Sequence, residues 1–236
     1  MNLKWVIGDI RGDLHLFKKL MDKIGPTSSD TVIFLGSYLG PGKDSKGCVQ
    51  YALDLKKKAP ESFLFLRGCY EFMFGRCIGI GEKSGKKPPI DVLNLWSKMQ
   101  GNKVFESYSM VKTASIRLVG GGVEEIPMQI PADHLELFDG GLSHWYEDET
   151  LPFIATHAGY HPSTHGDKQE ELTAFTANDW WKNDLASIPG KQVIFSHVPF
   201  KKPFLSKSKI GIDLGCGLGG KLCAFEAYSQ TFTEVS

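Results

Sequence analysis

Five side chains that can bind a metal or an anion follow short apolar runs of the sequence. Asp9 and Arg11 lie in GDIRG after the first run, and Cys69 lies in RGCYE after the third. His157 and His197 lie in HAG and SHVP after two later runs. Carboxylate, thiolate and imidazole groups are ligands of zinc and other divalent metals. A single histidine in such a place is more often structural, so a metal site requires a fold that brings these residues together.

The apolar runs and the amphipathic segments between them predict the elements that hold these residues. Strands and helices alternate in the first third of the chain, in the order 3–8, 14–24, 31–35, 44–58, 63–66 and 71–80. Asp13 is placed to cap the first helix, and Gly25 and Pro26 end it. Strands separated by helices predict a parallel sheet with helices packed on it. Ligands of such sheets bind at the carboxyl ends of the strands, where the five side chains lie.

The rest of the chain is richer in predicted strands. The expected helices are 90–100 and 131–138, and the expected strands are 152–156, 192–195, 210–214 and 222–227. Residues 79–89, with the sequence GIGEKSGKKPP, lack an apolar face and are predicted as a loop. Because the chain has no internal repeat and a length typical of one or two domains, we predict a single domain over residues 1–236.

Composition limits the classes of function. The chain has 27 basic and 27 acidic residues, and this balance argues against non-specific binding to nucleic acid. Hydrophobic residues make up 42% of the sequence, which is enough for a core and excludes a disordered chain. No apolar run approaches the roughly 20 residues of a membrane helix, and the first residues lack the layout of a signal peptide. Five cysteines without a C-x-x-C pair indicate reduced thiols, so we expect a cytoplasmic protein.

Six short motifs follow one another along the chain: GDIRG, GSYLGPG, RGCYE, HAG, SHVP and IDLGCGLGG. Their order resembles that of the calcineurin-like metallophosphoesterases, and most of all the branch of the phosphoprotein phosphatases and diadenosine tetraphosphatases. The pattern of that family is G-D-x-H-G, G-D-x-V-D-R-G, G-N-H-E, H-A-G, G-H-T-P and I-D-x-G-x-x-x-G-G. The resemblance covers about the whole chain. It implies an α/β fold, a four-layer sandwich in which two mixed β-sheets are flanked by helices, with the site at one edge.

The resemblance implies a site for two metal ions, and this chain keeps three of its six ligand positions. The kept positions are Asp9, His157 and His197. The changed positions are Arg11 for the first ligand histidine, Ser37 for the aspartate that the two metals share, and Cys69 for the ligand asparagine. Paired metals activate a water and hold the phosphoryl oxygens, and two dications without a shared carboxylate repel each other. We therefore expect at most one ion, at the vestigial set Asp9, Cys69, His157 and His197.

The positions of the family's catalytic acid are also changed. Tyr70 stands where the resemblance implies a histidine, and Gly40 stands where the aspartate that supports it is expected. A phenol with a pKa of about 10 is a poorer acid than an imidazole for a leaving alkoxide near neutral pH. Pro41 replaces a phosphate-binding arginine, whereas Arg67 and Glu71 are retained. We therefore expect no catalytic residue at positions 40 and 70.

Three basic side chains are candidates for binding anions. Arg11 is a permanent cation close to Asp9 in sequence, and we expect it to fill the place of the first metal and to pair with that carboxylate. Arg11 and Arg67 together are also suited to hold a phosphate. Lys182, in DWWKND, resembles the residue of the W-x-R segment in which the family's arginine contacts phosphate.

The simultaneous changes in three loops favour a protein without catalysis, a pseudophosphatase. Its function would be to bind a protein partner or a phosphorylated ligand, without a cofactor and with neither nucleic acid nor membrane as a partner. One alternative is a phosphoester hydrolase with a single zinc or manganese ion, similar to the serine/threonine phosphatases or to the dinucleoside polyphosphate hydrolases. The other alternative is a sensor that binds a nucleotide or phosphate beside Arg11 and Arg67.

Overall fold

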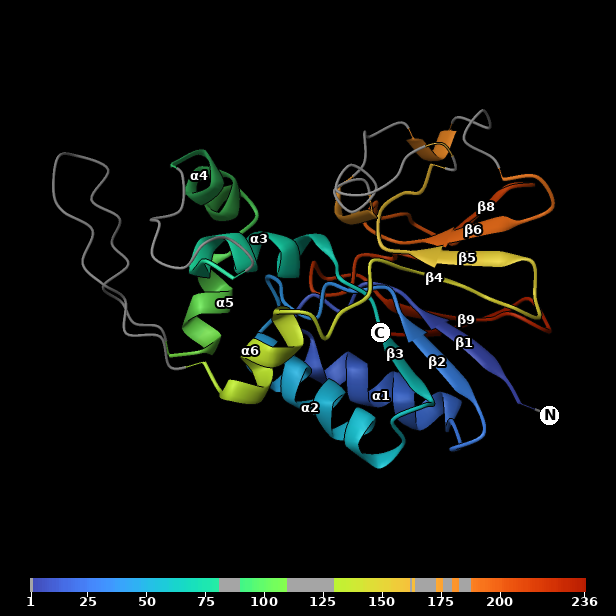
Figure 1. Ribbon diagram of the computed structural model, residues 1–236, viewed down its shortest axis with the longest axis horizontal. Helices are drawn as coiled ribbons and strands as arrows, with labels where there is room; N and C mark the ends of the chain where they lie inside the picture. The colour runs from blue at the N-terminus through green and yellow to red at the C-terminus, as the bar shows by residue number, and fades with distance from the viewer. Residues whose placement is uncertain are drawn as a thin grey trace, which may run out of the picture.

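Two five-stranded β-sheets lie face to face in the computed structural model of the chain (Figure 1). The structure describes residues 2–80, 90–109, 130–161, 163, 173–175, 180–182 and 188–236. The first sheet has the strand order β10 (Thr231–Val235), β9 (Leu222–Glu226), β1 (Lys4–Ile7), β2 (Thr31–Phe34) and β3 (Phe63–Phe65). The second sheet has the order β4 (Trp145–Glu147), β5 (Phe153–Thr156), β6 (Gln192–Phe195), β8 (Lys209–Gly211) and β7 (Phe204–Leu205).

Each sheet has parallel strands beside antiparallel ones. In the first sheet β1, β2 and β3 run parallel, and β9 and β10 form an antiparallel hairpin beside β1. In the second sheet β5, β6 and β8 run parallel, and β4 and β7 are antiparallel strands at the two edges. The predicted architecture of two mixed sheets is therefore confirmed, and six parallel strands supply the loops of the candidate site.

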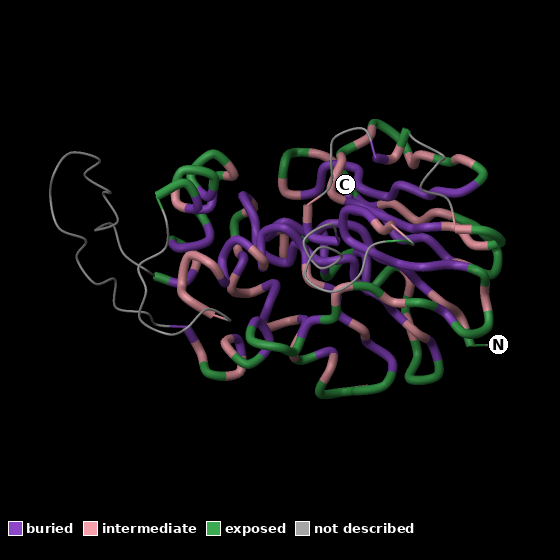
Figure 2. The backbone as a smooth tube through the Cα atoms, turned by 45° about the horizontal axis from the view of Figure 1, so that its top comes forward, coloured by how far each residue is buried: buried purple, intermediate pink, exposed green. Residues whose placement is uncertain are grey.

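Alternate side chains of the first sheet face two different layers. Ile7 and Phe34 belong to the core that the sheet shares with the helices on its outer face. Val6 and Ile33, their neighbours in the strands, belong to the core between the two sheets. Because the side chains of a strand alternate between its two faces, continuously apolar strands need cover on both sides. The tube drawing shows this burial along most strands of both sheets (Figure 2).

The described helices are α1 (Leu14–Ile24), α2 (Ser45–Lys58), α3 (Cys69–Ile78), α4 (Ile90–Lys98), α5 (Asn102–Ser107), α6 (Ala132–Phe138) and the short 3-10 helix η1 (Trp180–Lys182). Helices α1 and α2 cover the outer face of the first sheet, and α3 to α6 gather at one end of the sandwich (Figure 1). Phe74 of α3 joins that group, because its ring packs on the rings of Trp96, Phe105, Tyr108 and Phe138.

The predicted caps of the first helix are present. The Asp13 carboxylate accepts a hydrogen bond from the Leu16 amide at 3.0 Å, which satisfies one of the free donors at the start of α1. Gly25 ends the helix in left-handed backbone with φ 53°, a conformation that glycine adopts without a steric cost.

Other predicted bounds are shifted, and a few short elements were missed. Helix α3 begins at Cys69, two residues before its predicted start, because the Glu71 carboxylate accepts a hydrogen bond from the Gly68 amide and closes the first turn. The strand predicted at 210–214 ends at Gly211. The missed elements, α5, β4, β7, β10 and η1, have only two to six residues each. The predicted loop at 79–89 lies outside the described residues from position 81 onwards, and the single domain stays a prediction.

An ion pair ties the first sheet to the edge of the second. The Lys4 ammonium of β1 lies 2.7 and 2.5 Å from the two carboxylate oxygens of Asp148, which follows β4. The same carboxylate accepts hydrogen bonds from the Tyr146 hydroxyl and from the amides of Thr150 and Leu151. Burial raises the pKa of Asp148, but the hydrogen bonds from Lys4 and the amides outweigh it and lower the pKa to about 2. None of the helices in the described parts of the chain is long and apolar enough to cross a membrane.

Asp148→Ala should lower the free energy of unfolding by about 3 kcal/mol, because it leaves the Lys4 ammonium and two amides without their acceptor. Urea denaturation measures this loss, and Glu149→Ala, at the adjacent exposed position, is the control with an expected change within about 0.5 kcal/mol. The folded pKa of about 2 lies below the ordinary 3.8. The carboxylate therefore stabilises the fold above pH 3.8, and this contribution is lost as the pH falls through the folded value. Equal losses in the two variants would contradict this role.

Candidate metal centre

Six loops, each at the carboxyl end of a parallel strand, meet in the interior. They contribute the side chains of Asp9, Arg11, Ser37, Cys69, His157, His197 and Asp213. Arg11, Ser37 and His197 have φ values of 47°, 54° and 70°, a backbone conformation that non-glycine residues adopt only where the surroundings impose it. The loops after β2 and β3 also cross closely, since a Cβ on Gly36 would lie 2.4 Å from the amide nitrogen of Gly68.

The Arg11 guanidinium lies buried between two carboxylates. One terminal nitrogen is 2.8 Å from Asp9 Oδ2, and the two terminal nitrogens lie 2.8 and 2.5 Å from the two oxygens of Asp213 in a bidentate pair. Burial raises the pKa of Asp9, but the charges of Arg11 and His157 outweigh it and hold this pKa below its usual range. The carboxylates raise the pKa of Arg11 well above its usual value, against the effect of burial. The arginine is therefore a fixed cation, and its expected pairing with Asp9 is present.

Three other side chains with metal-binding atoms converge in the same region. Cys69 Sγ and one nitrogen each of His157 and His197 lie within 4.8 Å of one another. The His157 ring is fully buried, and its Nδ1 lies 3.1 Å from the Leu35 carbonyl oxygen, to which it can donate. His157 Nε2 and His197 Nδ1 are buried and make no hydrogen bond with the parts of the chain that the structure describes. Orphaned ring nitrogens in such a place are the groups that a metal ion satisfies.

The chemistry of this set fits a zinc-like ion. One thiolate and two imidazoles leave one of four tetrahedral positions open, as in catalytic zinc sites. A carbonyl that holds Nδ1–H of a histidine leaves the lone pair of Nε2 for a metal. Burial raises the pKa of the Cys69 thiol, but His157 and His197 outweigh it and bring the pKa to about 6, which favours the thiolate. Asp9 Oδ1 lies 3.2 Å from His157 Nδ1, the other ring nitrogen, so Asp9 serves Arg11 and His157 in this structure.

The family's acid position is occupied by a side chain with another partner. The Tyr70 hydroxyl donates a hydrogen bond to the Met99 carbonyl at 2.8 Å, and its ring packs on Trp96. Burial raises the pKa of Tyr70 above its usual range, which makes the phenol a still weaker acid. At position 40 a Cβ would lie 2.6 Å from the Arg11 Cα, so no aspartate fits there while Arg11 keeps its backbone conformation.

A buried glutamate holds two of the site loops in register. The Glu71 carboxylate accepts hydrogen bonds from the amides of Ser37 and Leu39 at 2.8 and 2.9 Å, and from the Gly68 amide at 3.0 Å. Ser37 Oγ lies 3.7 Å from Cys69 Sγ, so the hydroxyl that replaces the shared aspartate faces the thiol. Glu71 thereby fixes the loop after β2 against the start of α3, on which Cys69 lies.

The remaining predicted anion-binding residues lie outside this cluster. One terminal nitrogen of Arg67 is 3.0 and 3.1 Å from the two ring nitrogens of His144, and its guanidinium lies over the Phe72 ring. Lys182 is exposed on η1, with its ammonium 5.2 Å from the centre of the Trp181 ring. Their roles stay predictions. Sequence reasoning missed Asp213, although the motif IDLG at the end of a predicted strand contains it.

The chain is similar to known proteins both in sequence and in structure, although no family model matches it. The asymmetrical bis(5'-nucleosyl)-tetraphosphatase PrpE of Oceanobacillus iheyensis is 22% identical over 249 residues, which cover 98% of this chain and 91% of the relative. The enzyme of the same name from Halalkalibacterium halodurans is 21% identical over 250 residues, which cover 98% and 92%.

Two solved structures share the fold over the whole chain. A protein serine/threonine phosphatase from Saccharomyces cerevisiae superposes with a TM-score of 0.61 at 12% identity, over 99% of this chain and 79% of its own. A metallophosphoesterase from Sphaerobacter thermophilus superposes with a TM-score of 0.53 at 16% identity, over 100% and 88%. The chain has the fold of these phosphatases and metallophosphoesterases, and its sequence is similar to those of the two tetraphosphatases. In this fold the Arg11 guanidinium lies between Asp9 and Asp213.

Arg11→Met should lower the free energy of unfolding by about 3–5 kcal/mol, because it leaves two buried carboxylates without their cation. The substitution should also change how the free energy of unfolding depends on pH. In the parent protein the depressed pKa of Asp9 gives a contribution to stability that is fully present above pH 3.8 and is lost as the pH falls below it. In the variant burial raises that pKa, so stability falls as the pH rises from 5 to 8. Urea denaturation across this range is the measurement, with exposed Lys103→Met as the control. A variant with the pH profile of the parent would contradict the assignment.

Proposed function

We propose that the chain is a phosphoester hydrolase that uses one divalent metal ion in place of two. The observation that carries this proposal is the convergence of Cys69 Sγ and the nitrogens of His157 and His197 within 4.8 Å. These residues would hold the ion. A divalent metal bound in such a site supplies Lewis-acid polarisation of a phosphoryl oxygen and lowers the pKa of a water molecule.

The chain's own residues supply the electrostatic frame. Arg11 occupies the space between Asp9 and Asp213, so its charge neutralises carboxylates that would otherwise attract a second ion. Both of its terminal nitrogens are engaged by carboxylates, so we assign the phosphate group to Arg67, whose guanidinium also contacts His144 and Phe72. Glu71 keeps the loops of Ser37 and Cys69 in place during turnover.

The tyrosine at position 70 favours hydrolysis of one class of phosphate bond. An alkyl phosphoester needs a proton on its leaving alkoxide, and Tyr70 is a weak acid whose proton is bound to the Met99 carbonyl. A phosphoanhydride has a phosphate as leaving group, which departs as an anion near neutral pH because the second pKa of a phosphate is about 6. The loss of a general acid therefore costs little for this bond. Dinucleoside polyphosphates contain such bonds, and the names of the two curated relatives support this substrate class.

A second candidate function is binding without turnover, the pseudophosphatase. The observation in its favour is the buried ion pair of Arg11 with Asp9 and Asp213, which takes the place of one catalytic metal. Such a protein would bind a protein partner or a phosphorylated small molecule, or act as a nucleotide or phosphate sensor. For either function we keep the expectation of a cytoplasmic protein.

Purified protein should contain one zinc or manganese ion per chain, and Cys69→Ala or His157→Ala should lower this content at least tenfold. Elemental analysis gives the content, and His15→Ala, an exposed histidine on α1, is the matched control with full metal content.

With zinc or manganese added, the parent should hydrolyse diadenosine tetraphosphate, and His197→Ala should reduce kcat/KM at least a hundredfold. A phosphoserine peptide should be a poor substrate, because its leaving alkoxide requires the missing acid. A folded parent protein that holds less than a tenth of an ion per chain and hydrolyses neither compound would sink the hydrolase and leave the binding protein.

A further inference from the structure

A line of aromatic rings leads outward from the candidate metal centre. The ring centroids of His157 and His197 are 5.1 Å apart, those of His197 and Phe175 are 5.9 Å apart, and those of Phe175 and Phe72 are 5.6 Å apart. The last two contacts are edge-to-face, with interplanar angles of 86° and 75°. Phe72 and Phe175 are half-buried, whereas the ring of His157 is fully buried. The line thus runs from the interior towards the surface.

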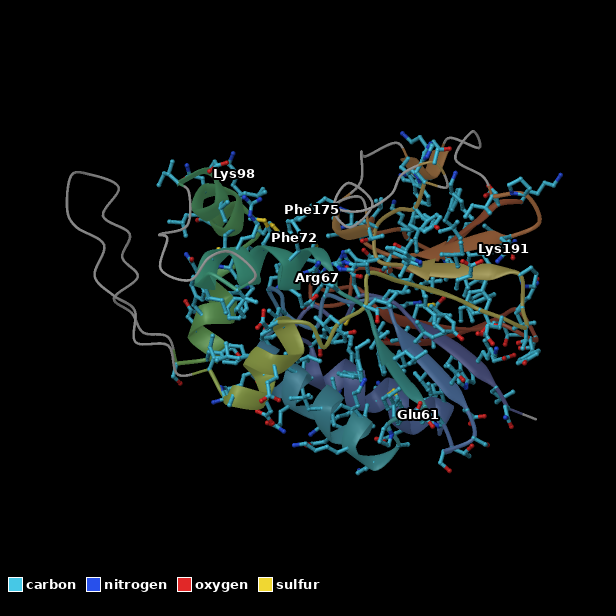
Figure 3. All side chains as sticks on the ribbon, viewed as in Figure 1. Glu61, Arg67, Phe72, Lys98, Phe175 and Lys191 are labelled. Atoms are coloured by element: carbon cyan, nitrogen blue, oxygen red, sulfur yellow. The ribbon has the colours of Figure 1, made fainter. Side chains whose placement is uncertain are left out.

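Two arginines lie against the outer end of this line. The guanidinium carbons of Arg67 and Arg76 are 5.7 and 5.9 Å from the centroid of the Phe72 ring. Arg67 comes from the loop after β3, two residues before Cys69, so one arginine is close both to the centre and to the aromatic rings. Figure 3 shows Arg67, Phe72 and Phe175 together between α3 and the second sheet.

The two phenylalanines come from different parts of the chain, and both are anchored to the centre. Phe72 is in the first turn of α3, three residues after Cys69. Phe175 follows Thr173, whose carbonyl accepts a hydrogen bond from the amide of Ala158 at 2.8 Å. Because Ala158 comes directly after His157, the backbone that carries Phe175 is fixed to the backbone that carries a candidate metal ligand.

We infer that Phe72 and Phe175 form a binding surface for a nucleobase, with Arg67 beside it for the attached phosphates. This inference rests on the proposed function of the same site and names the part of the substrate that lies outside the reacting bond. Half-buried aromatic rings with arginine beside them are the groups on which proteins stack bases, and such stacking tolerates different bases because each has a π-face. A phosphate held near Arg67 and the metal centre places its nucleoside along the line of rings.

The position of these rings argues for a ligand surface in addition to a packing role. The large fully buried rings of Phe74 and Trp96 fill the core behind α3. Phe72 and Phe175 pack against the edge of this core, but Phe72 also contacts two cations and Phe175 also contacts a candidate metal ligand. The two phenyl rings have arginines at one end and an imidazole at the other. This arrangement suits a nucleotide, because the faces of its base are apolar and its phosphates are anionic.

Binding of two matched compounds tests the inference. Adenosine 5′-(α,β-methylene)diphosphate carries the base and resists hydrolysis, and methylenediphosphonate is the same phosphonate group without the nucleoside. Isothermal titration calorimetry of the zinc-loaded protein should show that Phe175→Ala weakens the nucleotide about tenfold and leaves methylenediphosphonate within about twofold. Phe72→Ala should act in the same way, and Phe175→Trp should restore nucleotide affinity because a larger π-face replaces the phenyl ring.

Phe204→Ala is the matched control, since Phe204 is also half-buried and packs on the rings of Trp181 and Phe200 in the second sheet. It should change neither affinity. The inference would be overturned if Phe175→Ala weakened both compounds equally or changed the affinity for neither. It would also be overturned if the parent protein bound methylenediphosphonate as tightly as the nucleotide. These outcomes differ from failure of the proposed function, which appears as absent metal and absent turnover. A parent protein that binds neither compound also overturns the inference.

Discussion

The ion pair of Arg11 with Asp9 and Asp213 is the interaction around which the site is organised. Asp9 follows a strand of the first sheet and Asp213 follows a strand of the second, so the guanidinium joins both halves of the sandwich at the point where their loops meet. Two buried carboxylates without a cation would carry a large desolvation cost. The side chain of Arg11 supplies this positive charge permanently. The left-handed backbone of Arg11 is the conformation that places the guanidinium there.

The geometry of the neighbouring positions follows from that constraint. The Arg11 backbone approaches position 40 so closely that only glycine fits, which removes the aspartate that would support a catalytic histidine. At position 70 the tyrosine hydroxyl is bonded to the Met99 carbonyl. The residues at positions 11 and 40 are therefore physically connected. The metal-binding atoms of Cys69, His157 and His197 converge beside this ion pair, and Asp9 Oδ1 lies 3.2 Å from His157 Nδ1.

The sequence was sufficient to predict which loops meet, because ligands of parallel sheets collect at the carboxyl ends of strands and the order of the motifs identifies those ends. Asp9, Arg11, Cys69, His157 and His197 were found in this way. Asp213 was missed because its role depends on where the long Arg11 side chain reaches, which spacing does not encode. Phe72 and Phe175 belong to no sequence motif that indicates a binding site. Phe72 lies on a helix whose apolar residues are expected for packing alone, and Phe175 lies in an irregular segment. The short strands β4, β7 and β10 form through pairing with neighbours rather than through their own residue pattern.

The weak acid at position 70 and the aromatic pair Phe72 and Phe175 favour the same class of substrate. A site that cannot protonate a leaving group is restricted to bonds whose leaving group is already a stable anion, such as the phosphate of an anhydride. Nucleotides contain such bonds and carry bases with large apolar faces. For these a stacking surface next to Arg67 supplies binding energy far from the reacting bond, and energy of this kind can be used to orient the phosphates at the metal centre. A lost acid and a gained base-binding surface therefore favour the same substrate, and each alone would be a weaker argument for it.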